Sequence, residues 1–293
     1  AARARAAEAR LSDALHGRLT ERFVNRRTSV LMKKLGPDAG LLPVTIAGNA
    51  VEVDGEHIGQ LAGFRFRVDP GARLADRKLL LAAAERHLPA LLGDRAAGLI
   101  DAIAERTAPL ELAGTRIAWD GEVVARLIPS RSILTPLLQP DPALDALAPA
   151  RKQELLAALD RWLGHALAPL APLRKLEAAA TDPAAGPELR ALLIRLVEAG
   201  GLLERGESGL DRLDPGQRAM LRKLGLRVGA LDLFVPAMLK PAALGTWNAV
   251  LAVRGGKMIP SPPGMPPVLP LTGKAGPPPG YRVLGQQALR IDL

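Results

Sequence analysis

Two groups of basic side chains have the spacing needed to bind phosphates. The first group recurs at helical intervals, so its members fall on one helix face: Arg18, Arg22, Arg26 and Lys33. The second group lies near the end of the chain: Arg218, Arg222, Lys223, Arg227 and Lys240. Such cations bind phosphate oxygens whatever the base sequence. Both groups are therefore predicted to contact nucleic acid.

The charge of the chain is concentrated around these two groups. The 293 residues carry a net charge of +9. Residues 1–36 hold nine Lys and Arg against three Asp and Glu, residues 205–257 hold nine against four, and the remainder is slightly acidic. Two basic segments in an otherwise balanced chain indicate a polyanion-binding footprint. An arginine-rich composition that made two surfaces basic by accident is the alternative.

The residues of a catalytic or metal centre do not accompany these cations. The nearest match to a nucleotide-binding loop is Gly273-Lys274, with Ala275 where a hydroxyl residue belongs and Val268 where the first glycine belongs. The chain has no cysteine, and its four histidines are scattered, so no metal site is expected. The chain by itself is therefore not expected to be an enzyme.

Two carboxylate pairs, Asp54/Glu56 and Asp120/Glu122, could be considered for acid–base or metal chemistry. Each pair flanks an Asp-Gly dipeptide between two β-prone runs. That pattern is typical of a tight hairpin turn, in which the carboxylates are solvated. The turn is the preferred interpretation.

The first basic group requires a long helix to position it. Leu11, Leu15, Leu19 and Phe23 repeat every four residues, and Gly36-Pro37 ends the pattern. Residues 1–36 are thus predicted to form a long basic amphipathic helix. Because the segment begins without Met and has the pattern of a helix interior, we expect it to continue from an absent part of a larger polypeptide.

Residues 41–135 are predicted to form a small α+β unit with two Asp-Gly hairpins. The segments 48–61 and 114–127 align without gaps at an offset of 66 residues. The alignment indicates either an old duplication or two hairpins of one sheet. Helices are expected at 72–87 and 89–106, divided by Pro89.

The second basic group falls in a predicted helical bundle, residues 142–254, which follows a proline-containing connector at 129–142. Asp214-Pro215-Gly216-Gln217 has the pattern of a capped helix start. The helix at 187–199, the run Leu202–Arg205 and the basic helix at 215–224 together resemble a winged-helix or helix-turn-helix arrangement. The proline-rich tail and terminal strand, 255–293, complete a predominantly helical α+β fold. Residues 255–280 are expected to form no sheet ladder.

No uninterrupted run of about 18 apolar residues is present, so no membrane association is expected. The start of the chain lacks the apolar core of a secretory signal. The absence of cysteine is compatible with a reducing compartment. A cytoplasmic location is therefore expected.

Four segments resemble the C-terminal accessory region of bacterial superfamily 2 (DEAD/DEAH-box) helicases related to the mitochondrial degradosome-type RNA helicase. They are residues 19–35, 53–66, 186–201 and, most specifically, 213–243, with the sequence LDPGQRAMLRKLGLRVGALDLFVPAMLKPAA. The resemblance implies a segment that packs behind the ATP-driven motor and guides single-stranded DNA or RNA. ATP and Mg²⁺ would belong to the absent motor, and this chain would hold no cofactor.

The partners implied are a nucleic-acid strand, the helicase motor domains of the same polypeptide, and a nuclease. Two other functions remain open at this point. One is a protein-interaction scaffold that docks a nuclease or the motor. The other is an independent winged-helix DNA-binding regulator, which would show sequence preference and a two-fold site.

Overall fold

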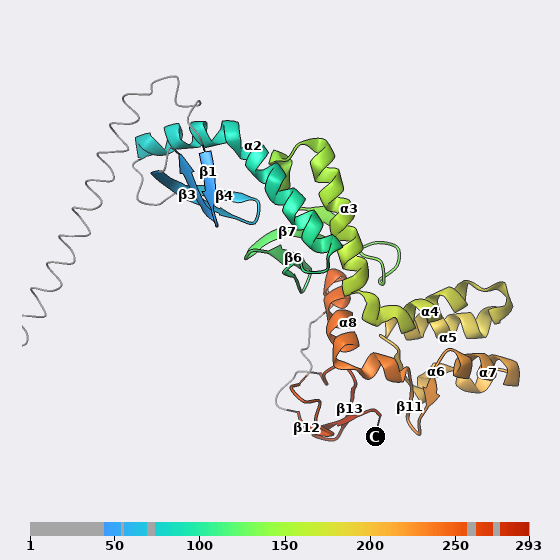
Figure 1. Ribbon diagram of the computed structural model, residues 1–293. Coiled ribbons are helices and arrows are strands. Elements are labelled where there is room, and N and C mark those ends of the chain that lie inside the picture. Colours follow the sequence, from blue (N-terminus) through green and yellow to red (C-terminus); the bar gives the residue numbers. More distant parts are fainter. Residues whose placement is uncertain (1–43, 54–55, 69–73, 257–261, 272–275, 293) are drawn as a thin grey trace, which may run out of the picture. The chain divides into compact units, whose positions relative to one another are not determined.

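The computed structural model describes residues 44–53, 56–68, 74–256, 262–271 and 276–292 (Figure 1). The predicted helix at 1–36 lies outside these residues. The chain forms two compact units. The first contains the described residues up to Pro109, together with Trp119–Val124 and Asp141–Leu155; the second contains Leu110–Ala118, Ala125–Pro140 and the chain from Leu156 onward. The fold is mixed α+β.

The chain begins with a four-stranded antiparallel meander in the order β1-β2-β3-β4. Its strands are β1 (Val44–Ala47), β2 (Ala50–Val53), β3 (Glu56–Ala62) and β4 (Arg65–Val68). A second four-stranded sheet has the order β5-β6-β7-β8. Its strands are β5 (Leu110–Ala113), β6 (Arg116–Trp119), β7 (Glu122–Ile128) and β8 (Leu137–Pro140). The hairpins therefore belong to separate sheets, and β8 lies within the expected connector.

The two sheets match each other at the offset found in the sequence. Strands β5, β6 and β7 each begin 66 residues after β1, β2 and β3. The amide of Leu61 donates to Asn49 O at 2.7 Å, and the equivalent amide of Leu127 donates to Thr115 O at 2.7 Å. Shared strand starts and a shared irregular hydrogen bond favour duplication over two hairpins of one sheet.

The second Asp-Gly dipeptide forms the predicted turn. Asp120 and Gly121 have φ of 53° and 75°, and a type I′ turn requires positive φ at both central residues. The first dipeptide, Asp54-Gly55, lies outside the described residues, although β2 and β3 flank it as expected.

Helix α2 (Leu74–Ala104) runs through Pro89 without a break, so the prediction of two helices divided at that residue is wrong. Proline removes one backbone hydrogen bond, but tertiary packing of the flanking turns can offset that cost. Leu92, Ala96, Leu99 and Ile103 are buried along the second half of the helix. Their spacing of three and four residues gives α2 an apolar stripe.

The next helices bury leucines at helical spacing. They are α3 (Pro149–Ala166), α4 (Ala171–Thr181) and α5 (Gly186–Glu198). The 3₁₀ turn η2 (Pro142–Ala146) precedes α3 and is capped by Asp141, and η3 (Ala168–Leu170) and η4 (Pro183–Ala185) connect the helices. Helices α4 and α5 pack together through buried residues that include Leu173, Leu176, Leu189 and Leu193.

The segment expected to be a helical bundle also contains a small sheet, and this corrects the prediction. After α5 come β9 (Leu202–Glu204), α6 (Arg205–Ser208), η5 (Leu210–Arg212), α7 (Pro215–Lys223), β10 (Arg227–Val228) and β11 (Asp232–Phe234). The antiparallel sheet has the order β10-β11-β9. Strands of two and three residues leave too short an alternation to be recognised from sequence.

The proline-rich tail contributes to a fourth antiparallel sheet. After η6 (Pro236–Leu239) and α8 (Pro241–Val253), β12 (Val268–Pro270), β13 (Tyr281–Leu284) and β14 (Gln287–Arg290) pair in the order β12-β14-β13. The expectation that 255–280 forms no ladder is therefore wrong for β12. Pro270 is tolerated because β12 is an edge strand. Among the described residues, no helix is long and apolar enough to cross a membrane.

Candidate nucleic-acid interface

Helix α7 carries three of the five phosphate contacts predicted for the second basic group, and its start is fixed by a capping box. Asp214 Oδ1 accepts from the amide of Gln217 at 2.8 Å, and Gln217 Oε1 accepts from the amide of Asp214 at 3.1 Å. Pro215 occupies the first helical position, where its missing N–H costs nothing. The helix start predicted from Asp214-Pro215-Gly216-Gln217 is confirmed.

Helix α7 is held on one side and exposed on the other. Leu221 is buried, and Gln217 Nε2 donates to Ala185 O, at the start of α5, at 3.2 Å. These two contacts fix the rotation of the helix about its axis. Arg218, Arg222 and Lys223 are consequently presented to solvent.

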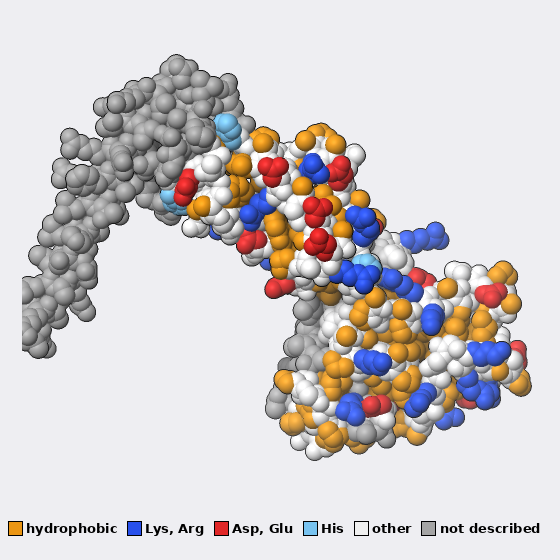
Figure 2. All heavy atoms as spheres, in the orientation of Figure 1, with side chains coloured by type: hydrophobic (Ala, Val, Ile, Leu, Met, Phe, Trp, Pro, Cys, Tyr) orange, Lys and Arg blue, Asp and Glu red, His pale blue; other side chains and the backbone are white. Residues whose placement is uncertain are grey.

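The remaining two predicted contacts, Arg227 and Lys240, are also exposed. Arg227 lies on β10, just after the turn at Gly225, whose φ of 87° favours glycine. Lys240 precedes the first turn of α8. Figure 2 shows Lys and Arg side chains gathered over the region where Figure 1 places α6 and α7.

Most of these cations have no protein partner. Arg218 Nη2 donates to Asp211 O at 3.2 Å. Within the described part of the chain, the side chains of Arg222, Lys223, Arg227 and Lys240 have no hydrogen bond or ion pair of their own. Their charges therefore remain available to a polyanion. The other predicted group, Arg18, Arg22, Arg26 and Lys33, lies outside the described residues.

The β10–β11 hairpin, which follows α7 in the chain, exposes residues that the sequence did not predict to be part of the site. Val228 and Leu231 are 47% and 57% exposed. Arg205 Nη1 donates to Gly229 O at 3.4 Å, and the amide of Arg205 donates to Leu231 O at 2.8 Å. No local sequence pattern predicts this cluster, because Arg205 contacts the hairpin only when β9 and β11 are paired.

A half-buried ion pair joins the same small sheet to the C-terminal strand β13. Arg282 Nη2, on β13, lies 3.3 Å from Asp232 Oδ1 and 3.1 Å from Glu204 Oε1. Burial raises the pKa of Asp232, with Arg282 opposing the rise and Glu204 adding to it. Burial likewise raises the pKa of Tyr281, whose hydroxyl donates to Pro266 O at 2.6 Å.

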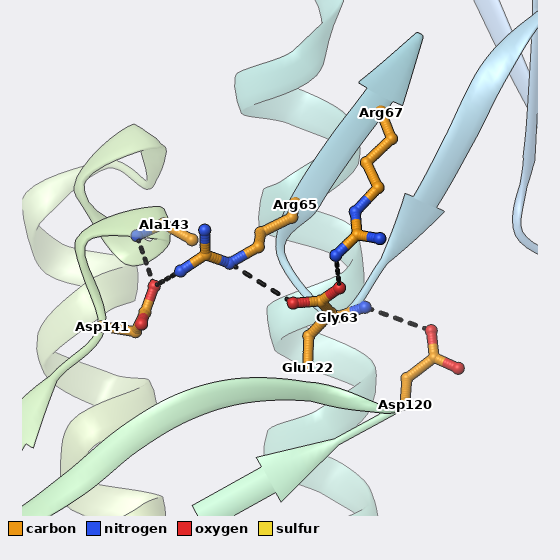
Figure 3. A network of polar contacts seen from close by, with 7 residues as sticks. All are labelled: Gly63, Arg65, Arg67, Asp120, Glu122, Asp141 and Ala143. Carbon is orange, nitrogen blue, oxygen red and sulfur yellow. Dashed lines mark hydrogen bonds and ion pairs between the residues drawn. The ribbon is translucent and has the colours of Figure 1, made fainter. Parts of the chain in front are cut away.

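The carboxylates of the second Asp-Gly hairpin are engaged in structural contacts (Figure 3). Arg65 bridges two acids, with Nη2 2.6 Å from Asp141 Oδ1 and Nε 3.5 Å from Glu122 Oε2. Arg67 also pairs with Glu122. Asp141 is itself buried and caps the amide of Ala143 at 3.0 Å.

Asp120 is held in a similar way on the other side of the turn. Its carboxylate accepts from the amide of Gly63 at 3.1 Å and from Asn49 Nδ2 at 3.2 Å, and it pairs with Arg95. The Arg95 guanidinium also lies 4.8 Å from the Trp119 ring centroid. These acids are therefore occupied in holding the hairpin, which favours the turn interpretation over acid–base chemistry.

No cluster of three or more His, Asp or Glu suited to a metal ion exists among the described residues. Comparison of the chain with family models, with curated proteins and with solved structures gives no match.

Proposed function

We propose that this chain is a non-catalytic, nucleic-acid-binding accessory region of an ATP-dependent helicase, which guides single-stranded DNA or RNA behind the motor. The observation that carries the proposal is the exposed basic face of α7 with Arg227 and Lys240 nearby in the sequence. Unpartnered cations on a rigid helix contact phosphates without losing protein hydrogen bonds. The helicase part rests on the resemblance of residues 213–243 to the region that follows the motor.

The order of elements around α7 supports this role. A helix (α5), a strand (β9), a short helix (α6), a second helix (α7) and a two-stranded hairpin (β10–β11) follow each other, with sheet order β10-β11-β9. This order resembles that of a winged helix, in which the helix before the hairpin is the one that enters or borders the groove. In this proposal α7 is that helix and β10–β11 is the wing.

A purely structural explanation covers only part of the basic group. Cations in the last turn of a helix are stabilised by the helix dipole, which accounts for Arg222 and Lys223. It does not account for Arg227 on a strand or for Lys240 before the first turn of another helix. Phosphate binding accounts for all five positions.

The test is charge reversal on α7. A chain with Arg218→Glu, Arg222→Glu and Lys223→Glu should bind labelled single strands at least about a hundredfold more weakly, because each replacement loses a contact and adds repulsion. The matched control carries Arg116→Glu, Arg126→Glu and Arg161→Glu, which are also exposed and give the same net charge. Equal affinity of both variants for single strands would contradict the proposal.

The winged-helix order also favours a second candidate, a DNA-binding regulator. This candidate predicts a preference for particular base pairs and a palindromic site bound by a dimer. The accessory region predicts neither. Selection of bound duplexes from a random pool, with sequencing of the product, separates the two.

A further inference from the structure

The second unit contains a cavity of about 890 Å³ that the proposed α7 surface does not use. It lies between the segment 130–137, the second half of α3 and helix α4. Its lining combines the buried leucines Leu134, Leu163 and Leu167 with the charged residues Arg131, Arg174 and Glu177. A cavity of this size, apolar with a few convergent polar groups, is typical of a small-ligand site.

Arg174 is the unusual residue in this cavity. Its Nε atom is buried and has no hydrogen-bond partner. Buried polar groups are nearly always hydrogen-bonded, because burial without an acceptor is costly, and more so for a charged group. Since Arg174 lies in a cavity wall, the missing acceptor is readily supplied by a ligand.

Glu177 and three of the hydroxyls around Arg174 are already engaged. Glu177, one turn further along α4, accepts from Ser132 Oγ at 2.5 Å. Ser130 Oγ donates to Ser132 O at 2.8 Å, and Thr181 Oγ1 donates to Ala178 O at 2.7 Å. The donors left in the wall are therefore the guanidinium groups of Arg174 and Arg131, neither of which has a side-chain partner among the described residues.

We propose that this cavity binds one phosphodiester of a nucleic-acid strand, with Arg174 and Arg131 as the donors. Guanidinium groups match the geometry of phosphate oxygens. The wall also holds Asp160 and Glu177, so its formal charge is balanced, and a singly charged phosphodiester is favoured over a polyphosphate. The leucines offer an apolar surface to the attached nucleoside. This inference rests on the proposed function, because it takes the ligand to be a nucleic-acid strand.

The experiment compares Arg174→Gln with Lys175→Gln in the full chain. Lys175 is the exposed neighbour of Arg174 on α4 and lies outside the cavity wall, so its replacement removes the same charge. Affinities are measured by fluorescence anisotropy for a labelled single-stranded octanucleotide and for a duplex. Arg174→Gln should weaken single-strand binding by about tenfold to a hundredfold, the usual worth of a charge-assisted hydrogen bond, while Lys175→Gln stays within about twofold of the unmodified chain.

Folding of the variants is checked by thermal unfolding. Because Arg174 Nε has no partner to lose, the unfolding temperature of Arg174→Gln should be no lower than that of the unmodified chain. A variant at the cavity mouth, Arg131→Ala, provides a second reading, since an exposed side chain is removed without disturbing the core. This variant should also bind the octanucleotide more weakly than the unmodified chain.

The outcomes separate this inference from the proposed function. If the α7 charge reversal abolishes binding while Arg174→Gln changes nothing, the proposed function stands and the cavity proposal is overturned. If the unmodified chain binds no strand at all, both fail. Competition by inorganic phosphate or a mononucleotide at the same concentration as the octanucleotide would identify a free-phosphate site, which also overturns the strand proposal.

Discussion

Gly200, at the end of α5, lies directly against a core tryptophan. Its φ is +68°, and a Cβ at this position would come within 2.5 Å of Trp247 Nε1. Trp247 is buried, so it cannot move aside without disturbing its neighbours. Both the backbone conformation and the close approach therefore require glycine here.

Replacement of Gly200 by alanine should destabilise the second unit by about 2 to 4 kcal/mol, from positive-φ strain and overpacking together. Gly209 is a matched control, because its φ is +70° but a Cβ there would meet nothing. Gly209→Ala should cost only the strain, about 1 kcal/mol. Urea unfolding followed by tryptophan fluorescence measures the free energy of unfolding of both variants. Equal losses of stability would contradict the role assigned to Trp247.

Asp232 should make stability depend on pH. Burial raises its pKa above the ordinary value of 3.8, so the folded chain binds this proton more tightly than the unfolded chain. The resulting stabilisation is present below pH 3.8 and is lost as the pH rises through the folded pKa. Asp232→Asn removes this dependence.

The variant should thus gain stability relative to the unmodified chain as the pH rises from about 4 to about 7. Arg282 keeps Glu204 as a partner in the variant. The free energy of unfolding across that pH range is the measurement. Parallel pH profiles for the two chains would show that Asp232 titrates normally.

At the scale of elements, Arg95 is expected to hold helix α2 to the β3–β4 turn and to the β6–β7 turn. It donates to Gly63 O at 2.8 Å, pairs with Asp120 and lies over Trp119. Arg95→Ala should lower the stability of the first unit by about 2 to 4 kcal/mol, because Asp120 and Gly63 O lose a charged donor. Arg67→Ala is the control: its side chain is 67% exposed and also pairs with a carboxylate.

An exposed ion pair contributes about 0 to 1 kcal/mol, so Arg67→Ala should have little effect. Hydrogen exchange of the amides in α2 and β3 reports on this unit by itself. Similar protection in both variants would mean that Arg95 is no more important than a surface arginine.

The elements that sequence predicted well are those determined by local pattern. The Asp214 capping box and the Asp120-Gly121 turn each depend on residues within a few positions of one another. The elements that were missed depend on distant partners. Strand β9 forms because β11, about thirty residues later, pairs with it, and β12 forms because β14 supplies its hydrogen bonds.

The same distinction applies to the candidate sites. Arg218 and Arg222 were predicted because i, i+4 spacing places them on one helix face. The Arg174 cavity was not predicted, because its walls come from three segments that no local pattern connects. Pro89 was misread because packing of the flanking turns outweighs the local preference of one residue.

At the scale of the whole molecule, the two halves of the chain differ in their elements and in how their cations are paired. Its first half contains the repeated meanders 66 residues apart, and its second half contains the small sheet β10-β11-β9 and the basic helix α7. In the first half Arg65, Arg67 and Arg95 are paired with acids, whereas around α7 most of the described cations are not. Among the described residues, the strand contact is therefore proposed for the cations around α7, in the second unit.

The most direct test of that claim is the salt dependence of single-strand binding by the whole chain. The five contacts of the second basic group alone should contribute about −3.5 to the slope of log affinity against log salt, hence a loss of at least about a hundredfold between 50 and 200 mM. The α7 charge-reversal variant should show a shallower slope, because it has lost three of those contacts. An affinity for single strands that does not change with salt, or that falls equally in both chains, would contradict the account.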